Sequence, residues 1–153
     1  MAKVYEFLAN GFEEIEGLAP VDILRRGGVD IKTVSVTGSE FVETSHEGVR
    51  QALIAQHKAG KRVGAICAAP MVLASTGILD GKKATCYPSF EQYFDASTEY
   101  TGTLFQEDGN VITGEGPAAT LPYAYQILSY FVSKETVAAL QDGMMYDHLM
   151  KSK

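Results

Sequence analysis

The strongest constraint on the fold is the order in which strand-like and helix-like segments alternate along the chain. Residues Lys3 to Leu8 are rich in strand formers, and apolar residues recur at helical spacing from Ile15 until Gly27 and Gly28 close the segment. Residues Val29 to Val36 again favour a strand. A strand, a helix and a strand form a βαβ unit, so we expect a right-handed crossover and two parallel strands.

The alternation continues along the rest of the chain. We expect helices over 47–59, from Pro70 to about 76, over 121–131 and after Ser133, strands over 62–66 and 83–87, and a hairpin turn at Asp108-Gly109. The chain has 153 residues, 46% of them hydrophobic, which suits one globular domain over 1–153. The predicted fold class is α/β: a flavodoxin-like three-layer sandwich with a mostly parallel sheet and an antiparallel hairpin.

Charge and hydropathy exclude several classes of partner. The formal net charge is -6 and the basic residues are scattered, which argues against nucleic acid as a partner. No apolar run approaches the ~20 residues of a membrane span, and the N-terminus opens on a strand rather than a leader. We therefore expect no membrane association and a cytoplasmic protein whose two cysteines are free thiols.

Cys67 lies where a buried strand gives way to a helix. Pro70 fits only the first turn of that helix, so Cys67 is expected beside unpaired backbone N–H groups and the positive end of the helix dipole. Such settings lower a cysteine pKa from about 8.5 to ~3.5–7.5, which makes the thiolate available as a nucleophile. The alternative is a small apolar residue packed in the core. For Cys86, within a strand-like run, the inert interpretation is favoured.

Four segments together resemble one protein family. Ala65-Ile66-Cys67-Ala68-Ala69-Pro70 resembles the nucleophile elbow of the DJ-1/ThiJ/PfpI superfamily, and the other three resemble its acidic loop, first helix and late glycine-proline turn: 11–16, 20–28 and 114–117. The resemblance spans most of the chain and implies a class I glutamine amidotransferase-like fold, a ThiJ-like bacterial branch and a homodimer.

The resemblance also implies roles for three residues. Cys67 corresponds to the reactive cysteine, Glu16 to the glutamic acid that contacts its sulfur, and the backbone N–H of Ala68 to one donor of an oxyanion hole. A carboxyl group beside a thiolate in a partly desolvated pocket should hold its proton, so Glu16 could donate to the thiolate and move protons on a substrate. The alternative for Glu16 is an exposed acid at a helix start.

The sequence departs from the family in two places. PfpI-type peptidases carry a histidine directly after the cysteine, where this chain has Ala68, and in some relatives a later histidine stands where this chain has Tyr87. None of His46, His57 and His148 is expected near Cys67, which weakens the peptidase interpretation.

A family segment of roughly 30 residues, about one βαβ unit, is apparently missing between Ser45 and Glu47. It includes a central strand and the second oxyanion donor. Either the segment is deleted, or the numbered sequence omits it. We favour the second explanation, because loss of a central strand leaves its neighbours unpaired. A continuous peptide at His46-Glu47 would remove the oxyanion hole from the mechanism.

The leading functional hypothesis is a cysteine-dependent enzyme of the glyoxalase III or deglycase type. In it, Cys67 adds to a small aldehyde or glycated substrate, Glu16 moves protons, and no metal or organic cofactor takes part. The alternative is a redox-sensing or chaperone-like stress protein in which Cys67 is oxidised. A PfpI-type cysteine peptidase is the third hypothesis.

Overall fold

The N-terminal part of the chain forms the expected βαβ unit. The structure is a computed structural model that describes residues 3–9, 11–36 and 46–152. Strand β1 (Lys3–Ala9) and strand β2 (Asp30–Val36) pair in parallel along their whole length, and helix α1 (Glu14–Arg26) connects them. Helix α1 ends at Gly27-Gly28, where Gly28 has a φ of +79° that favours glycine.

A second group of strands carries the elbow. Helix α2 (Glu47–Lys58) leads into strand β3 (Val63–Ile66), and Pro70 opens the short helix α3 (Pro70–Ala74) as predicted. Strand β3 pairs in parallel with β7 (Val111–Gly114), which forms an antiparallel hairpin with β6 (Phe105–Asp108). The hairpin turn begins at Gly109, whose φ is +61°.

Other elements differ from the expectation in length or number. The strand expected over 83–87 is only β4 (Lys83–Ala84), because the next N–H, that of Thr85, donates to the Thr113 hydroxyl instead of extending the ladder. Strand β4 pairs in parallel with β5 (Glu99–Tyr100), which was not predicted. The remaining elements are the 3₁₀ helices Phe90–Tyr93 and Pro117–Ala119 and the helices α4 (Thr120–Leu128), α5 (Lys134–Gly143) and α6 (Tyr146–Lys151).

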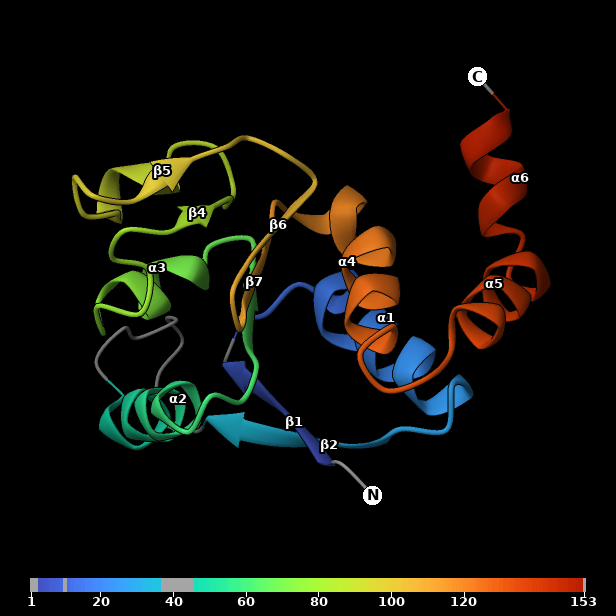
Figure 1. The fold of residues 1–153 in the computed structure, drawn as a ribbon, viewed down its shortest axis with the longest axis horizontal. Coiled ribbons are helices and arrows are strands. Elements are labelled where there is room, and N and C mark those ends of the chain that lie inside the picture. Colours follow the sequence, from blue (N-terminus) through green and yellow to red (C-terminus); the bar gives the residue numbers. More distant parts are fainter. Residues whose placement is uncertain (1–2, 10, 37–45, 153) are drawn as a thin grey trace.

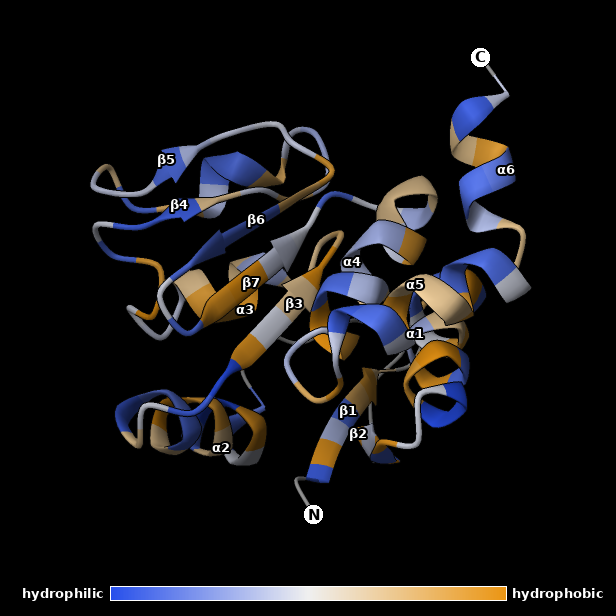
Figure 2. Ribbon diagram, turned by 45° about the vertical axis from the view of Figure 1, so that its right-hand side comes forward, coloured by the Kyte–Doolittle hydropathy of each residue, from blue (hydrophilic) through white to orange (hydrophobic). Residues whose placement is uncertain are grey.

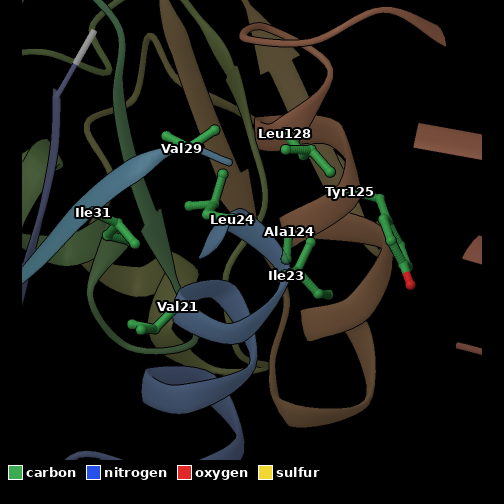
Figure 3. Packing of buried hydrophobic residues seen from close by; sticks show 8 residues of the cluster. All are labelled: Val21, Ile23, Leu24, Val29, Ile31, Ala124, Tyr125 and Leu128. Atoms are coloured by element: carbon green, nitrogen blue, oxygen red, sulfur yellow. The ribbon is translucent and has the colours of Figure 1, made fainter. Parts of the chain in front are cut away.

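Helices lie on both sides of the strands, which confirms the predicted α/β sandwich. Figure 1 shows α1 and α4 on one side and α2 and α3 on the other. Helix α2 carries both hydrophobic and hydrophilic residues along its length (Figure 2). One buried cluster joins α1, β2 and α4 (Figure 3): Val21, Ile23, Leu24, Val29, Ile31, Ala124, Tyr125 and Leu128. A second cluster surrounds β3 and includes Leu73, Leu79 and Val111.

The sheet is interrupted between β1 and β3. Within the described residues, β1 is hydrogen bonded only to β2, and β3 only to β7. Tyr5 and Phe7, which alternate along β1 and share one face, are 55% and 38% exposed, so this face of the strand is incompletely covered. The Oε2 atom of Glu6, on the same strand, is buried and has no hydrogen-bond partner in the described part of the chain.

The predicted loss of a family segment between Ser45 and Glu47 falls beside residues that the structure does not describe, and it stays a prediction. The backbone runs from His46 directly into α2, and His46 caps the helix by accepting the Val49 N–H at Nδ1. Ser45 lies outside the described residues. Within the described residues, the structure places only Ala68 as a backbone donor at the sulfur, so the mechanism below uses no two-donor oxyanion hole.

No helix in the described ranges is both long and apolar enough to cross a lipid bilayer.

Candidate active site

The backbone at Cys67 forms a sharp turn between β3 and α3. Cys67 has a φ of +62°, a left-handed conformation that a residue other than glycine adopts at a cost of about 1–2 kcal/mol. Two backbone hydrogen bonds hold the turn: the Cys67 N–H donates to the Gly114 carbonyl at 3.0 Å, and the Cys67 carbonyl accepts the Tyr87 N–H at 2.8 Å. A strained strand-to-helix turn that is bonded on both sides is the geometry of a nucleophile elbow.

Glu16 approaches the sulfur of Cys67 from helix α1, which connects β1 and β2. It lies in the first turn of α1, where the Glu13 carboxylate accepts its backbone N–H at 2.9 Å and caps the helix. Its side chain is close enough to the Cys67 thiol for each group to shift the pKa of the other. Its Oε1 atom is buried and has no hydrogen-bond partner among the described residues. The structure thus brings together Cys67 and Glu16, the two residues on which the predicted chemistry depends.

The expected lowering of the Cys67 pKa is wrong for this structure. Burial raises the pKa of the Cys67 thiol to about 12, and the hydrogen bond and negative charge of Glu16 act in the same direction. Helix α3 begins only at Pro70 and has five residues, so its dipole lowers the pKa of the Cys67 thiol only weakly. Burial also raises the pKa of Glu16. Two buried acids in contact resist double ionisation, so the pair shares one proton over a wide pH range.

Ala68 contributes a backbone donor to the same sulfur. Its N–H is hydrogen bonded to Cys67, which lowers the pKa of the thiol and opposes the effect of burial. The predicted partner donor belongs to the family segment that the sequence analysis expects to be missing between Ser45 and Glu47. Ala68 therefore stays in the site as a single donor that stabilises negative charge on sulfur.

Tyr87 and Gly116 form the remaining surroundings of the pair. A Cβ atom at Gly116 would lie 3.2 Å from the Tyr87 ring and 4.0 Å from Oε1 of Glu16. The Tyr87 side chain is 46% exposed and stands edge-on to Phe90, with ring centroids 6.4 Å apart. The sequence indicated a turn at Gly116. It did not indicate that the Tyr87 ring and the Glu16 carboxyl group approach each other there, because contacts between distant segments depend on the tertiary structure.

The other candidates of the sequence analysis lie elsewhere. His46 caps α2, His57 lies in the last turn of that helix, and His148 lies in α6. Cys86 is fully buried, which agrees with the inert interpretation. No group of three or more potential metal ligands converges in the part of the chain that the structure describes.

A pocket of about 550 Å³ lies at the carboxyl ends of β1 and β2, next to the acidic loop. Its lining residues are Leu8, Ala9, Gly11, Phe12, Thr33 and Ser35. Neither Cys67 nor Glu16 lines it. The pocket is adjacent to the loop that leads to Glu16, at the end of the sheet where open α/β folds bind ligands.

Comparisons with known proteins agree with this geometry. DJ-1beta of Drosophila melanogaster is 28% identical over 175 aligned residues, which cover 90% of this chain and 94% of that protein. Its crystal structure superposes with a TM-score of 0.85 at 25% identity, covering 94% of this chain and 97% of that one. A deglycase of Pyrococcus horikoshii is 37% identical over 60 residues, 39% of this chain and 36% of the relative. The DJ-1/PfpI family profile matches residues 2–52 and 44–130, and the chain belongs to that family.

Proposed function

We propose that the protein is a cysteine-dependent enzyme that acts on small carbonyl compounds, of the glyoxalase III or deglycase type. The observation that supports this function is the proximity of the Glu16 carboxyl group to the Cys67 thiol at a strained elbow, where each group shifts the pKa of the other. A thiol whose pKa is raised needs a base at the moment of attack, and Glu16 is in direct contact with it. The similarity to a deglycase adds support over the segment that it covers.

The first step is addition of the thiol to the aldehyde of a substrate such as methylglyoxal. The bond from sulfur to the aldehyde carbon forms as the S–H proton passes to the Glu16 carboxylate, and the carbonyl oxygen takes up a proton to give a hemithioacetal. The Ala68 N–H, already bonded to sulfur, stabilises negative charge on sulfur before the attack.

Glu16 then moves a proton between neighbouring carbons of the adduct. It removes the proton from the carbon that bears sulfur and returns one to the adjacent carbon, which converts the hemithioacetal into a thioester. Water hydrolyses the thioester, releases lactate and restores the thiol. The steps use only the thiol, the carboxyl group and water, so the proposal includes no metal or organic cofactor.

The proposal is tested by comparing methylglyoxal turnover in the parent protein with that in Cys67→Ser. Loss of the thiol should reduce kcat/KM by at least ~10³-fold, and Glu16→Gln should reduce it by ~10²–10⁴-fold. The matched control is Cys86→Ser, which removes a thiol outside the site and should leave the rate within a factor of about two. Equal rates for the parent and Cys67→Ser would end the enzymatic proposal.

A redox-sensing or chaperone-like stress protein is the alternative, and the difference between the two thiols favours it. Cys67 is partly exposed whereas Cys86 is buried, so peroxide would reach Cys67 selectively. Mass spectrometry after mild peroxide treatment measures this directly. Addition of two oxygens at Cys67 in a protein without methylglyoxal turnover would favour the sensor. A PfpI-type peptidase is the weakest hypothesis, because Ala68 stands where the histidine would be.

The organisation of the chain is part of the proposal. We infer a single domain over 1–153 from which a family segment between Ser45 and Glu47 is absent. Three observations support the inference: the alignment with DJ-1beta is longer than this chain, the two profile matches overlap at 44–52, and the sheet is interrupted between β1 and β3.

We further propose that the protein is a homodimer in the cytoplasm, where free thiols stay reduced. Ile15 and Leu18 of α1 are 54% and 56% exposed, which suits a helix that another subunit covers. Light scattering coupled to size exclusion measures the assembly, and a monomer at micromolar concentration would contradict this part.

A further inference from the structure

Tyr87 is bonded directly to the elbow that carries the reactive thiol, and its side chain lies beside the site. Its backbone N–H donates to the Cys67 carbonyl at 2.8 Å, so the residue is tied to the elbow itself. Tyr87 is 46% exposed, and one edge of its ring packs against Gly116.

The ring and the free oxygen of Glu16 lie over the same residue. Measured from the position of a Cβ atom at Gly116, the Tyr87 ring is 3.2 Å away and Oε1 of Glu16 is 4.0 Å away. Glu16 acts on the pKa of the Cys67 thiol, and the Tyr87 backbone is bonded to the Cys67 carbonyl, so the ring, the carboxyl group and the elbow gather around Gly116. The absence of a side chain at Gly116 allows both groups to approach this closely.

Neighbouring aromatic rings restrict the movement of Tyr87. Phe90 stands edge-on to it at a centroid distance of 6.4 Å, and Tyr93 lies 5.8 Å beyond Phe90. Ser89, between Tyr87 and Phe90, has a φ of +76°, which turns the chain sharply and brings Phe90 back toward Tyr87. A ring in contact on two sides forms a wall rather than a mobile flap.

We propose that Tyr87 determines the size of the substrates that reach Cys67, acting as a steric wall that admits small aliphatic aldehydes and excludes bulky or aromatic ones. This inference rests on the proposed function for its substrates, but the wall can be measured on the thiol alone. The test uses alkylation of Cys67, in which sulfur forms a thioether bond and the reagent gives up a leaving group or adds across a double bond.

The experiment compares a small and a bulky reagent, iodoacetamide and N-pyrenylmaleimide, on the full chain in a Cys86→Ser background. Tyr87→Ala should accelerate the bulky reagent about tenfold and the small one less than about twofold, in line with the discrimination that pocket size gives. Tyr87→Phe keeps the ring and should leave both rates unchanged. Tyr87→Trp should slow the bulky reagent further, and circular dichroism checks that each variant is folded.

Two results would overturn the proposal. Equal acceleration of both reagents in Tyr87→Ala would mean a general opening of the site, and Tyr87→Phe behaving like Tyr87→Ala would assign the effect to the hydroxyl. If turnover exists, the ratio of kcat/KM for phenylglyoxal to that for methylglyoxal should rise in Tyr87→Ala. If no variant turns over methylglyoxal, the alkylation rates still decide whether the wall exists.

Discussion

Glu6 on β1 provides a quantitative test of the structure, through the substitution Glu6→Gln. Burial raises the pKa of this carboxyl group from 4.5 to about 7, opposed only in part by the positive charge of Arg25. At 1.36 kcal/mol per pKa unit such a rise corresponds to about 3 kcal/mol, which partial exposure of the side chain reduces to about 2 kcal/mol. This is the free energy that ionised Glu6 costs the folded state.

The sign of the pH dependence follows from the raised pKa. Near pH 4.5 the folded protein holds the proton and the cost is small, whereas above pH 7 the carboxylate is ionised in both states and the full cost applies. Glutamine resembles the protonated carboxyl group and does not ionise. Relative to the parent, Glu6→Gln should therefore gain about 2 kcal/mol of unfolding free energy between pH 4.5 and pH 8.

Urea unfolding measures the free energy of unfolding of the parent and of Glu6→Gln at both pH values. The difference between the two proteins at pH 4.5 is then subtracted from the difference at pH 8, which removes any effect of the amide that does not depend on pH. The matched control is Glu99→Gln on β5, a 63% exposed carboxylate paired with Lys83, for which the gain should stay below about 0.5 kcal/mol. A gain for Glu6→Gln that is no larger than the control would refute the burial of Glu6 and the environment described for β1.

Three further predictions concern the elbow and the helix caps. Glu16→Gln removes the negative charge that raises the Cys67 pKa, so iodoacetamide should modify Cys67 faster at pH 8 even as turnover falls; slower alkylation would contradict the shared proton. Cys67→Gly should be more stable to urea than Cys67→Ala by about 1 kcal/mol, because glycine accepts the left-handed conformation, and the reverse order would contradict the strained turn. Ser133→Ala should lower the unfolding free energy by about 1 kcal/mol, since its hydroxyl accepts the Thr136 N–H at the start of α5, whereas Ser152→Ala beyond the last helix should have little effect.

The parts of the fold that the sequence predicted are those set by local pattern. Alternating apolar segments located β1, β2 and β3, and local turn and cap chemistry located Pro70 at the start of α3 and Ser133 at the cap of α5. The short β4 was overestimated, because its continuation depends on a hydrogen bond to Thr113, which is 28 residues away. Such a partner leaves no trace in the local sequence.

The pairing of Cys67 with Glu16 came from resemblance, while the direction of the thiol pKa required the structure. Sequence analysis could place Cys67 at a strand-to-helix junction, but it could not show that α3 has only five residues or that the thiol is buried against Glu16. Helix dipoles act within one turn, whereas desolvation and a neighbouring charge depend on how distant segments pack. The balance between those effects is a property of the tertiary structure.

Helix α4 holds the candidate site together across the interrupted sheet. Glu16 follows β1 and Cys67 follows β3, yet within the described residues these strands share no hydrogen bonds, so another element must fix their spacing. One face of α4 packs on α1, where Leu128 fills the space beside Gly27.

The Tyr123 side chain of α4 reaches the other group of strands. Its hydroxyl lies 2.7 Å from the Cβ position of Gly64, and its ring lies 3.0 Å from that of Gly114. The glycines at positions 27, 64 and 114 let α4 approach both α1 and the strands β3 and β7 closely. The contact between carboxyl and thiol is therefore a consequence of core packing around α4, and not of the continuous hydrogen-bonded sheet that usually positions an elbow in this fold.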